Sequence, residues 1–282
     1  MSGRYAFFPG CKIPAYSPYY AQATEAVLKA LGIELDKPEF NCCGYSMRNL
    51  YFEASVVASA RAMAIAEARG LDILTPCMCC YGNLRRAKVL FEENPSLKAE
   101  ANKVLAEEGL EYTGEGEIVH LFRVLYDEIG TERLSELAVK PLEGLKVAAL
   151  YGCHGLRPSK VTRLDHPWQP TIVDELLKAT GAEPVDWPGK ALCCGSVVRE
   201  TNEKLSFEMI TSRLREARQA GAQVLCISCP HSLMQAGWAY SVIGTGDGLV
   251  QATAVYPQLL GLAMGMDPAE LGVDQQLLEL VG

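Results

Sequence analysis

The hydrophobic positions of the chain follow two patterns, short apolar runs and longer stretches with helical spacing. Ser17 and Pro18 have the form of an N-cap with proline at the first helical position, and apolar residues then recur at helical spacing until Gly32. Residues 53–69 are rich in alanine, the strongest helix former. The apolar runs predict strands at residues 5–8, 33–35, 71–74, 145–150, 183–185 and 223–227, and the periodic stretches predict helices at 17–32, 53–69, 171–180 and 202–220.

The order of these elements repeats along the chain. Residues 26–44 parallel residues 175–195, and residues 67–80 parallel residues 216–229. Strands that alternate with helices indicate βαβ units with right-handed crossovers. The predicted fold class is therefore α/β, with two pseudo-symmetric βαβ-type lobes, small mainly parallel sheets, and ligand loops at the carboxyl ends of the strands.

The lobe boundary is predicted near residue 140, which gives domains at residues 1–140 and 141–282. Residues 85–140 are charged and helical in pattern, so we expect a helical insert within the first domain, with its charges on solvated faces. Residues 256–265 are apolar enough to dock as a terminal helix, against the chain itself or a partner.

Composition and charge exclude several function classes. The chain has 282 residues, 49% of them hydrophobic and 21% charged, and its net charge of −8 offers no basic surface for nucleic acid. Residues 1–10 do not have the form of a secretory signal, so a cytoplasmic location is expected. Residues 222–246 carry no charged side chain, but they contain two cysteines, Pro230 and His231. They are interpreted as a buried strand and a ligand-bearing loop, and the chain as not itself transmembrane.

Ten of the eleven cysteines form one pattern that occurs twice. Each copy has a lone cysteine, an adjacent pair followed by glycine, and two further cysteines: Cys11, Cys42, Cys43, Cys77 and Cys80, then Cys153, Cys193, Cys194, Cys226 and Cys229. In the cytoplasm such thiols stay reduced and bind metal or do redox chemistry more often than they form disulfides. At least 30 residues separate successive groups within each copy, so each group must lie on its own loop.

The number of thiols bears on the kind of metal. A structural zinc ion and a cubane iron-sulfur cluster both take four ligands, whereas each copy offers five thiols. Two side chains from consecutive positions do not readily close on one small ion, so the pairs favour a larger cluster. Gly44 and Gly195 would then allow the backbone a close approach. Zinc at one or both sites stays an alternative.

The doubled pattern resembles a known family. With Gly-Cys at both first cysteines and the QLLGLAMG segment near the end, the chain resembles the B subunit of heterodisulfide reductase and the bacterial heterodisulfide-reductase-like proteins over nearly its whole length. The resemblance implies that the ten cysteines hold two non-cubane 4Fe-4S clusters, which face one another across a disulfide substrate and supply one electron each. It also implies two partners in the complex, a ferredoxin-like C subunit and a flavin-bearing A subunit. The substrate would be a small disulfide or thiol, sulfane sulfur, or a lipoyl carrier protein, with electron flow in either direction.

Five further residues have two or more interpretations each. Cys79 has no counterpart in the second copy, where Ser228 stands, and is a substituted ligand, a reactive thiol or a buried bystander. His154 and His231 are candidate catalytic residues that would donate a proton to a leaving thiolate or hydrogen-bond a cluster sulfide, unless they only satisfy loop carbonyls. Lys12 and Arg157 are candidates for attracting an anionic thiol, or are ordinary loop charges.

The absence of nucleotide-binding and ferredoxin-type motifs leaves three candidate functions for the chain. There is no GxGxxG after a strand, no P-loop and no ferredoxin-type cysteine run, so electrons must come from or go to another protein. The leading function is a catalytic iron-sulfur subunit of a heterodisulfide-reductase-like complex, active with its partner subunits. One alternative is an accessory subunit of a succinate or fumarate, glycolate or lactate oxidoreductase. The other is a zinc-stabilised interaction scaffold.

Overall fold

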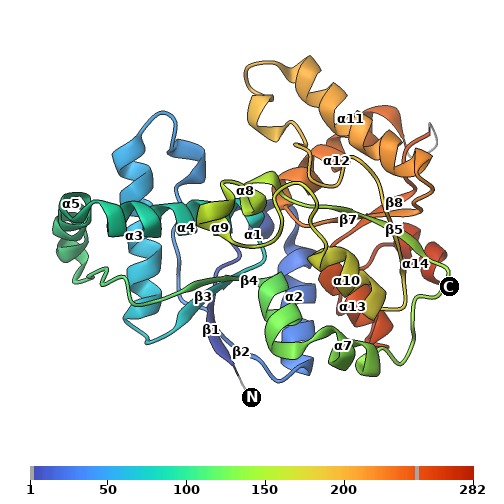
Figure 1. Cartoon of the computed structure of the whole chain (residues 1–282), viewed down its shortest axis with the longest axis horizontal. Coiled ribbons are helices and arrows are strands. Elements are labelled where there is room, and N and C mark those ends of the chain that lie inside the picture. Colours follow the sequence, from blue (N-terminus) through green and yellow to red (C-terminus); the bar gives the residue numbers. More distant parts are fainter. Residues whose placement is uncertain (1–2, 245–247) are drawn as a thin grey trace.

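The two halves of the chain form two similar lobes (Figure 1). The structure is a computed structural model that describes residues 3–244 and 248–282. The elements of the first half are β1 (Arg4–Phe7), α1 (Lys12–Tyr16), α2 (Pro18–Ala30), β2 (Glu34–Asp36), η1 (Tyr45–Met47), α3 (Phe52–Glu67), β3 (Asp72–Thr75), α4 (Met78–Glu93), α5 (Pro95–Leu105), η2 (Ala106–Glu108), β4 (Ile118–His120), α6 (Leu121–Arg123), η3 (Val124–Ile129) and α7 (Thr131–Leu137). Those of the second half are β5 (Lys146–Leu150), α8 (Cys153–Leu156), α9 (Ser159–Thr162), α10 (Ile172–Ala179), β6 (Glu183–Val185), η4 (Ser196–Val198), α11 (Glu203–Gln219), β7 (Val224–Ile227), α12 (Pro230–Ile243), β8 (Ala252–Ala254), α13 (Tyr256–Ala263) and α14 (Gln275–Val281).

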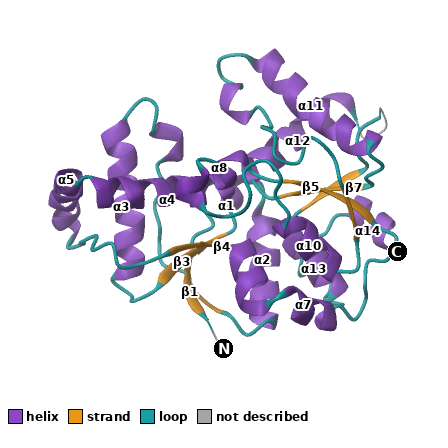
Figure 2. Cartoon of the chain, in the orientation of Figure 1, coloured by secondary structure: helices purple, strands orange, loops and turns teal. Residues whose placement is uncertain are grey.

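Each lobe contains one four-stranded parallel sheet with helices packed around it (Figure 2). The strand orders are β2-β1-β3-β4 and β6-β5-β7-β8, and every pairing is parallel. The predicted α/β class with two repeated parallel lobes is therefore confirmed. In each sheet the order reverses between the first and third strands, which places a crevice at their carboxyl ends.

Every strand and helix predicted from the sequence is present, with ends shifted by one or two residues. Pro18 stands at the start of α2 as expected, although the Ser17 side chain makes no capping hydrogen bond. Asn202 caps α11 by accepting a hydrogen bond from the Leu205 backbone nitrogen at 3.0 Å. Local capping signals and apolar periodicity were sufficient to locate these elements.

The fourth strand of each sheet was missed. β4 lies within residues 85–140, so the stretch expected to be a helical insert also contributes a strand to the first sheet. β8 follows α12 in the second lobe. Both strands have only three residues.

Two interpretations of the second half need correction. After β7 the uncharged stretch continues as α12 rather than as a loop, and residues 245–246 of that stretch lie outside the described residues. None of the helices in the described part of the chain is long and apolar enough to cross a membrane. The segment expected as a terminal helix is α13, which is followed by α14, and all eight of its residues are buried. Its packing against α2 of the first lobe shows that its apolar face is already covered within the chain.

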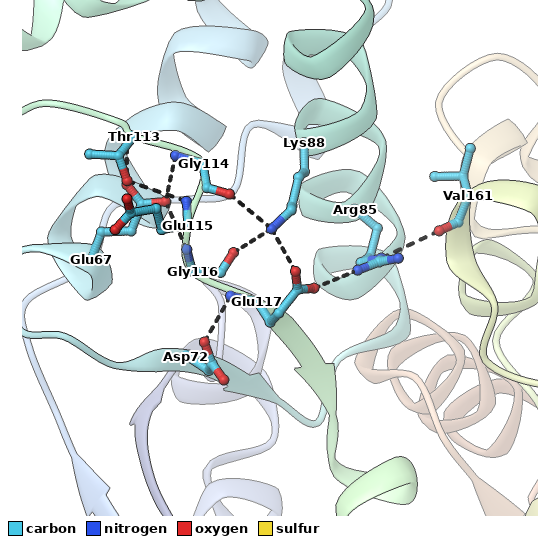
Figure 3. A network of polar contacts seen from close by, with 10 residues as sticks. All are labelled: Glu67, Asp72, Arg85, Lys88, Thr113, Gly114, Glu115, Gly116, Glu117 and Val161. Carbon is cyan, nitrogen blue, oxygen red and sulfur yellow. Dashed lines mark hydrogen bonds and ion pairs between the residues drawn. The ribbon is translucent and has the colours of Figure 1, made fainter.

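A buried lysine and a glutamate fix the loop that leads into β4 (Figure 3). The Lys88 ammonium on α4 donates to the carbonyl oxygens of Gly114 (3.1 Å) and Gly116 (2.7 Å) and pairs with Glu117 at 2.8 Å. From α3, Glu67 accepts hydrogen bonds from backbone nitrogens of the same loop. These bonds satisfy the loop's polar groups and fix α4 relative to the sheet.

Helix α4 also joins the lobes. It packs against α8 and α9 of the second lobe. Arg85 on α4 donates from Nε to the Val161 carbonyl oxygen at 3.3 Å and pairs with Glu117 at 3.0 Å (Figure 3). The close approach depends on Gly82, where a Cβ atom would lie 2.1 Å from the His154 carbonyl oxygen. The helix that carries Cys79 and Cys80 is therefore shared by both lobes.

Candidate metal centre

The first set of thiols comes together at the carboxyl ends of β1, β2 and β3. Cys11 directly precedes α1, Cys42 and Cys43 follow β2, and Cys77 is the N-cap of α4. The Cys11 and Cys42 Sγ atoms are 3.7 Å apart. Cys80 lies in the first turn of α4, and its backbone nitrogen donates to Cys77 Sγ at 3.4 Å. The structure thus gathers all five thiols that the sequence assigned to this site.

Hydrogen bonding between these thiols favours negative charge on one of them. The hydrogen bond from Cys11, followed by that from Cys43, holds the pKa of Cys42 far below its ordinary value. The same interactions raise the pKa values of Cys11 and Cys43. A thiolate is the form that binds metal, so Cys42 is the thiol of this set that is most ready to act as a ligand.

The paired cysteines are held by a turn that repeats in both lobes. Gly44 and Gly195 have φ values of +86° and +83°, and a Cβ on either would lie within 2.9 Å of a backbone oxygen of the following helix. The carbonyl oxygen of Cys43 accepts a hydrogen bond from Asn83 at 2.7 Å, and that of Cys194 accepts one from Gln235 at 3.4 Å. In each lobe, therefore, a side chain of the helix that follows the third strand holds this turn in place.

The second set brings together four of its five predicted thiols. Cys153 begins α8, Cys193 and Cys194 follow β6, and Cys229 is the N-cap of α12. The pKa of Cys193 lies far below its ordinary value because Cys153 and then Cys194 hydrogen-bond to it, which repeats the arrangement around Cys42. The pKa of Cys229 is lowered first by Cys77 and then by Cys79, so the two sets meet at this point.

Cys226 lies elsewhere. It is part of β7, between Ala149 of β5 and Ala254 of β8, and is fully buried. Burial and, secondarily, Asp174 raise the pKa of Cys226, with no contribution from another thiol. A negative charge on Cys226 would raise the pKa values of Tyr20 and Tyr256. The structure does not bring Cys226 to the other thiols of the second set.

A cavity of about 910 Å³ opens beside the second set. The cysteines that line it are Cys79, Cys153, Cys193, Cys194 and Cys229. Its charged and histidine side chains are Lys12, Arg48, Arg199, Glu200, Glu203, His154 and His231. The space is large enough to bring a small molecule against these thiols.

His154 lies between the thiols and two polar side chains of the first lobe. Its Nδ1 atom is 3.5 Å from Cys153 Sγ and 3.7 Å from Cys79 Sγ. Its Nε2 atom is 3.0 Å from the Tyr45 hydroxyl and 3.3 Å from Arg48 Nη2. Because arginine only donates, Nε2 accepts and Nδ1 carries the proton that faces the sulfur atoms. Burial, and secondarily Arg48, lowers the pKa of His154, which keeps the imidazole neutral.

The other candidate side chains divide between the cavity and the scaffold. His231 lines the cavity, with Nδ1 3.2 Å from the Ser196 hydroxyl. Lys12 also lines the cavity. Arg157 does not: its guanidinium donates to the carbonyl oxygens of Pro167 and Ala191 and stacks on a tryptophan. The interpretation of Arg157 as an attractor of anions is therefore replaced by a structural role. Arg48 and Arg199 were missed because nothing in their local sequence distinguishes them from other surface arginines.

No group of three or more His, Cys, Asp or Glu side chains within residues 3–244 and 248–282 is arranged to hold a single metal ion.

His120 is a buried titratable residue that sequence reasoning did not single out. It ends β4, is fully buried beside Tyr81 of α4, and caps α6 by accepting a hydrogen bond from the Phe122 nitrogen at 3.2 Å. Burial lowers the pKa of His120 to about 3.

This burial predicts acid sensitivity. Between about pH 6.5 and about pH 3 the unfolded chain binds a proton at His120 that the folded chain does not, so stability falls as the pH drops through this window. The loss between pH 7 and pH 5 is about 2 kcal/mol. In His120→Asn, which keeps a capping acceptor, the drop in melting temperature between these pH values should be smaller than in the wild type, measured anaerobically by circular dichroism. Equal drops in both proteins would contradict the assignment.

Two parallel α/β lobes, each gathering cysteines from three strand ends, define a class of duplicated cysteine-rich proteins. The family model described as a cysteine-rich domain, CCG, matches residues 5–85 and 147–235. The chain belongs to the family of the heterodisulfide reductase B subunit and its relatives, with two CCG domains.

Several curated relatives match nearly the full chain. The B subunit of the ferredoxin/F(420)H(2)-dependent CoB-CoM heterodisulfide reductase of Methanosarcina acetivorans is 36% identical, covering 97% of this chain and 93% of the relative. The 8-methylmenaquinol:fumarate reductase membrane anchor subunit of Wolinella succinogenes is 32% identical, covering 99% and 98%. Both relatives are parts of larger enzymes, as their names state.

The fold also occurs in a solved structure. A hypothetical protein from Helicobacter pylori superposes with a TM-score of 0.74 at 19% identity. The match covers 96% of this chain and 51% of the other, so the present chain corresponds to about half of that protein.

Proposed function

We propose that the chain is the catalytic iron-sulfur subunit of a heterodisulfide-reductase-like complex. It would reduce a disulfide or, in reverse, oxidise a thiol or sulfane sulfur. The observation that carries this proposal is the arrangement of two thiol sets at equivalent strand ends, one of them open to the 910 Å³ cavity. The names of the full-length relatives support the same assignment.

The donor chemistry fits iron-sulfur clusters. Each site has at least four thiols, the ligand number that such clusters take. The first site has one thiol of strongly lowered pKa, Cys42, and the second has two, Cys193 and Cys229. The first cluster would be held by Cys11, Cys42, Cys43, Cys77 and Cys80, and the second by Cys153, Cys193, Cys194 and Cys229. When bound, each cluster supplies or accepts one electron, so two of them match the two electrons of a disulfide bond. The non-cubane form, and the choice of iron over zinc at both sites, are part of this proposal.

The side chains around the cavity would bind and position the substrate. Lys12, Arg48 and Arg199 bring three positive charges to its wall, against two negative charges from glutamates. This balance favours a small anionic thiol or disulfide. Cleavage of a disulfide consumes two electrons and two protons and gives two thiols. His154 and His231 line the cavity, which makes them the candidates for transferring these protons.

Electrons would reach the chain from partner proteins of the complex, a ferredoxin-like C subunit with a flavin-bearing A subunit behind it. The sequence contains no nucleotide-binding motif of its own. A cytoplasmic location, where thiols stay reduced, belongs to the same proposal.

Metal analysis tests the first step of this proposal. The protein purified anaerobically should contain about eight irons and about eight acid-labile sulfides per chain, as expected for two four-iron clusters. Combined with its partner subunits and a chemical reductant, it should reduce a small disulfide, and the isolated chain should not accept electrons from a physiological donor. Zinc without sulfide would reject the redox function and favour the interaction scaffold.

The match to the membrane anchor of the fumarate reductase favours a second candidate function. The two chains align over almost their full lengths, which supports an accessory electron-transfer role in a fumarate-type oxidoreductase. The lactate-type alternative rests on a weaker match, to a lactate utilization protein A. Substrate assays with the partner subunits would separate the two. Fumarate-dependent electron transfer without disulfide reduction would select this second function.

A further inference from the structure

The register of the two sheets aligns the cysteines differently from the sequence pattern. Tyr5 of β1 pairs with Asp72, and Val147 of β5 pairs with Val224. Tyr5 and Val147 are equivalent, because each lies six residues before the first cysteine of its lobe. Counting five residues on from Asp72 and from Val224 then gives Cys77 and Cys229 as equivalent positions.

Two independent observations support this alignment. Cys77 is the N-cap of α4, and Cys229 is the N-cap of α12. Six residues further on, Asn83 and Gln235 hydrogen-bond the carbonyl oxygens of the two cysteine pairs, at Cys43 and Cys194. The CxxC of the second copy is therefore shifted by three residues from that of the first.

The shift leaves the second lobe one thiol short. Cys226 takes the place of Leu74 within the strand, and Ser232 takes the place of Cys80. Ser232 hydrogen-bonds the Cys194 thiol, as Cys80 does with Cys43, so it occupies the same position without a sulfur atom.

Cys79 supplies a thiol at this point. Its Sγ atom lies 3.6 Å from Cys229 Sγ, and it shares the Nδ1 atom of His154 with Cys153. It also lines the cavity together with the four thiols of the second set, which Cys226 does not. The side chain is 5% exposed, so it is not placed for reaction with solvent.

The geometry of α4 explains how one helix serves both sites. Cys79 and Cys80 are consecutive, so their side chains point about 100° apart around the helix axis. Cys80 faces the first site, since a Cβ on Gly10 would lie 2.5 Å from its Sγ atom. Cys79 faces the second lobe, against which α4 packs through Gly82.

We propose that Cys79, from the first lobe, is the fifth thiol of the second site, in place of the one missing at Ser232, and that Cys226 is a core residue of β7. The inference rests on the proposed function, because it assigns a ligand of a cluster at that site. It also makes the second site depend on correct docking of the two lobes.

The test compares three single variants of the full chain, purified anaerobically. Cys79→Ser should lower iron and sulfide from about eight to about four per chain, with loss of one of the two cluster signals in the electron paramagnetic resonance spectrum. Cys226→Ala, the matched control, should keep about eight irons. Cys80→Ser should lose the other cluster signal.

A rescue variant separates ligation from folding. In Cys79→Ser combined with Ser232→Cys the thiol moves to the position equivalent to Cys80, and iron should return to about eight per chain. If Cys79→Ser alone does not fold, the double variant still tests the proposal. Failure of the double variant to restore iron would then overturn it.

The outcomes distinguish this proposal from the function on which it rests. A wild-type chain without iron and sulfide overturns both. A wild-type chain with about eight irons, together with full iron in Cys79→Ser or a loss of iron in Cys226→Ala, overturns only the role of Cys79.

Discussion

Replacing Cys43 or Cys194 with serine is expected to halve the iron content and abolish disulfide reduction. Each residue is the buried member of its cysteine pair, and its thiol hydrogen-bonds the low-pKa cysteine beside it. Either variant should retain about four irons per chain, and the double variant should retain almost none. Activity should be lost in both single variants because a disulfide needs two electrons and each site supplies one.

The measurement is iron and sulfide content after anaerobic purification, followed by disulfide reduction in the reconstituted complex. Circular dichroism provides the folding control, since serine differs from cysteine by one atom and the carbonyl oxygen of Cys43 keeps its hydrogen bonds from Ser59 and Asn83. If both single variants kept full iron content and activity, the ligand assignment would be wrong.

Gly82→Ala is expected to push α4 away from α8 and to empty the second site. The added Cβ would lie 2.1 Å from the His154 carbonyl oxygen and 2.9 Å from its carbonyl carbon. Both are backbone atoms, so α4 and α8 must move apart, and such overpacking costs about 1–3 kcal/mol. The melting temperature should fall by several degrees, by roughly 2–4 °C for each kcal/mol. Since α4 carries Cys79 and α8 begins at Cys153, iron content should fall at the second site, with the first-site signal preserved.

Gly237→Ala is the matched control. Gly237 also lies within a helix, α12, but no atom lies within 4 Å of the position of a new Cβ. Alanine there should leave the iron content unchanged and stabilise the protein by up to about 1 kcal/mol through its helix propensity. Wild-type melting and iron content in Gly82→Ala would show that the lobe contact does not position the second site.

The two lobes show where sequence reasoning succeeded and where it failed. The apolar run of β1 and helix α2, with proline at its first position, were recognised because strand and helix signals are local. Strand β4 was missed because it lies within the charged stretch of residues 85–140. The sequence showed the repeat itself correctly. The third cysteine groups of the two copies, however, were aligned with one another by their shared CxxC motif. Strand register, together with the matching hydrogen bonds of Asn83 and Gln235, aligns Cys77 with Cys229 instead.

The same distinction applies to the site as a whole. The sequence by itself determined the fold class, the duplication and the placement of cysteine groups on separate loops at strand ends, because these follow from short-range patterns and from counting. The tertiary structure alone decided which thiols share a site, since that depends on the direction of each side chain and on contacts between residues more than a hundred positions apart. Cys79 and Cys229 meet because α4 packs on the second lobe, and Cys226 is withdrawn because it lies within a central strand.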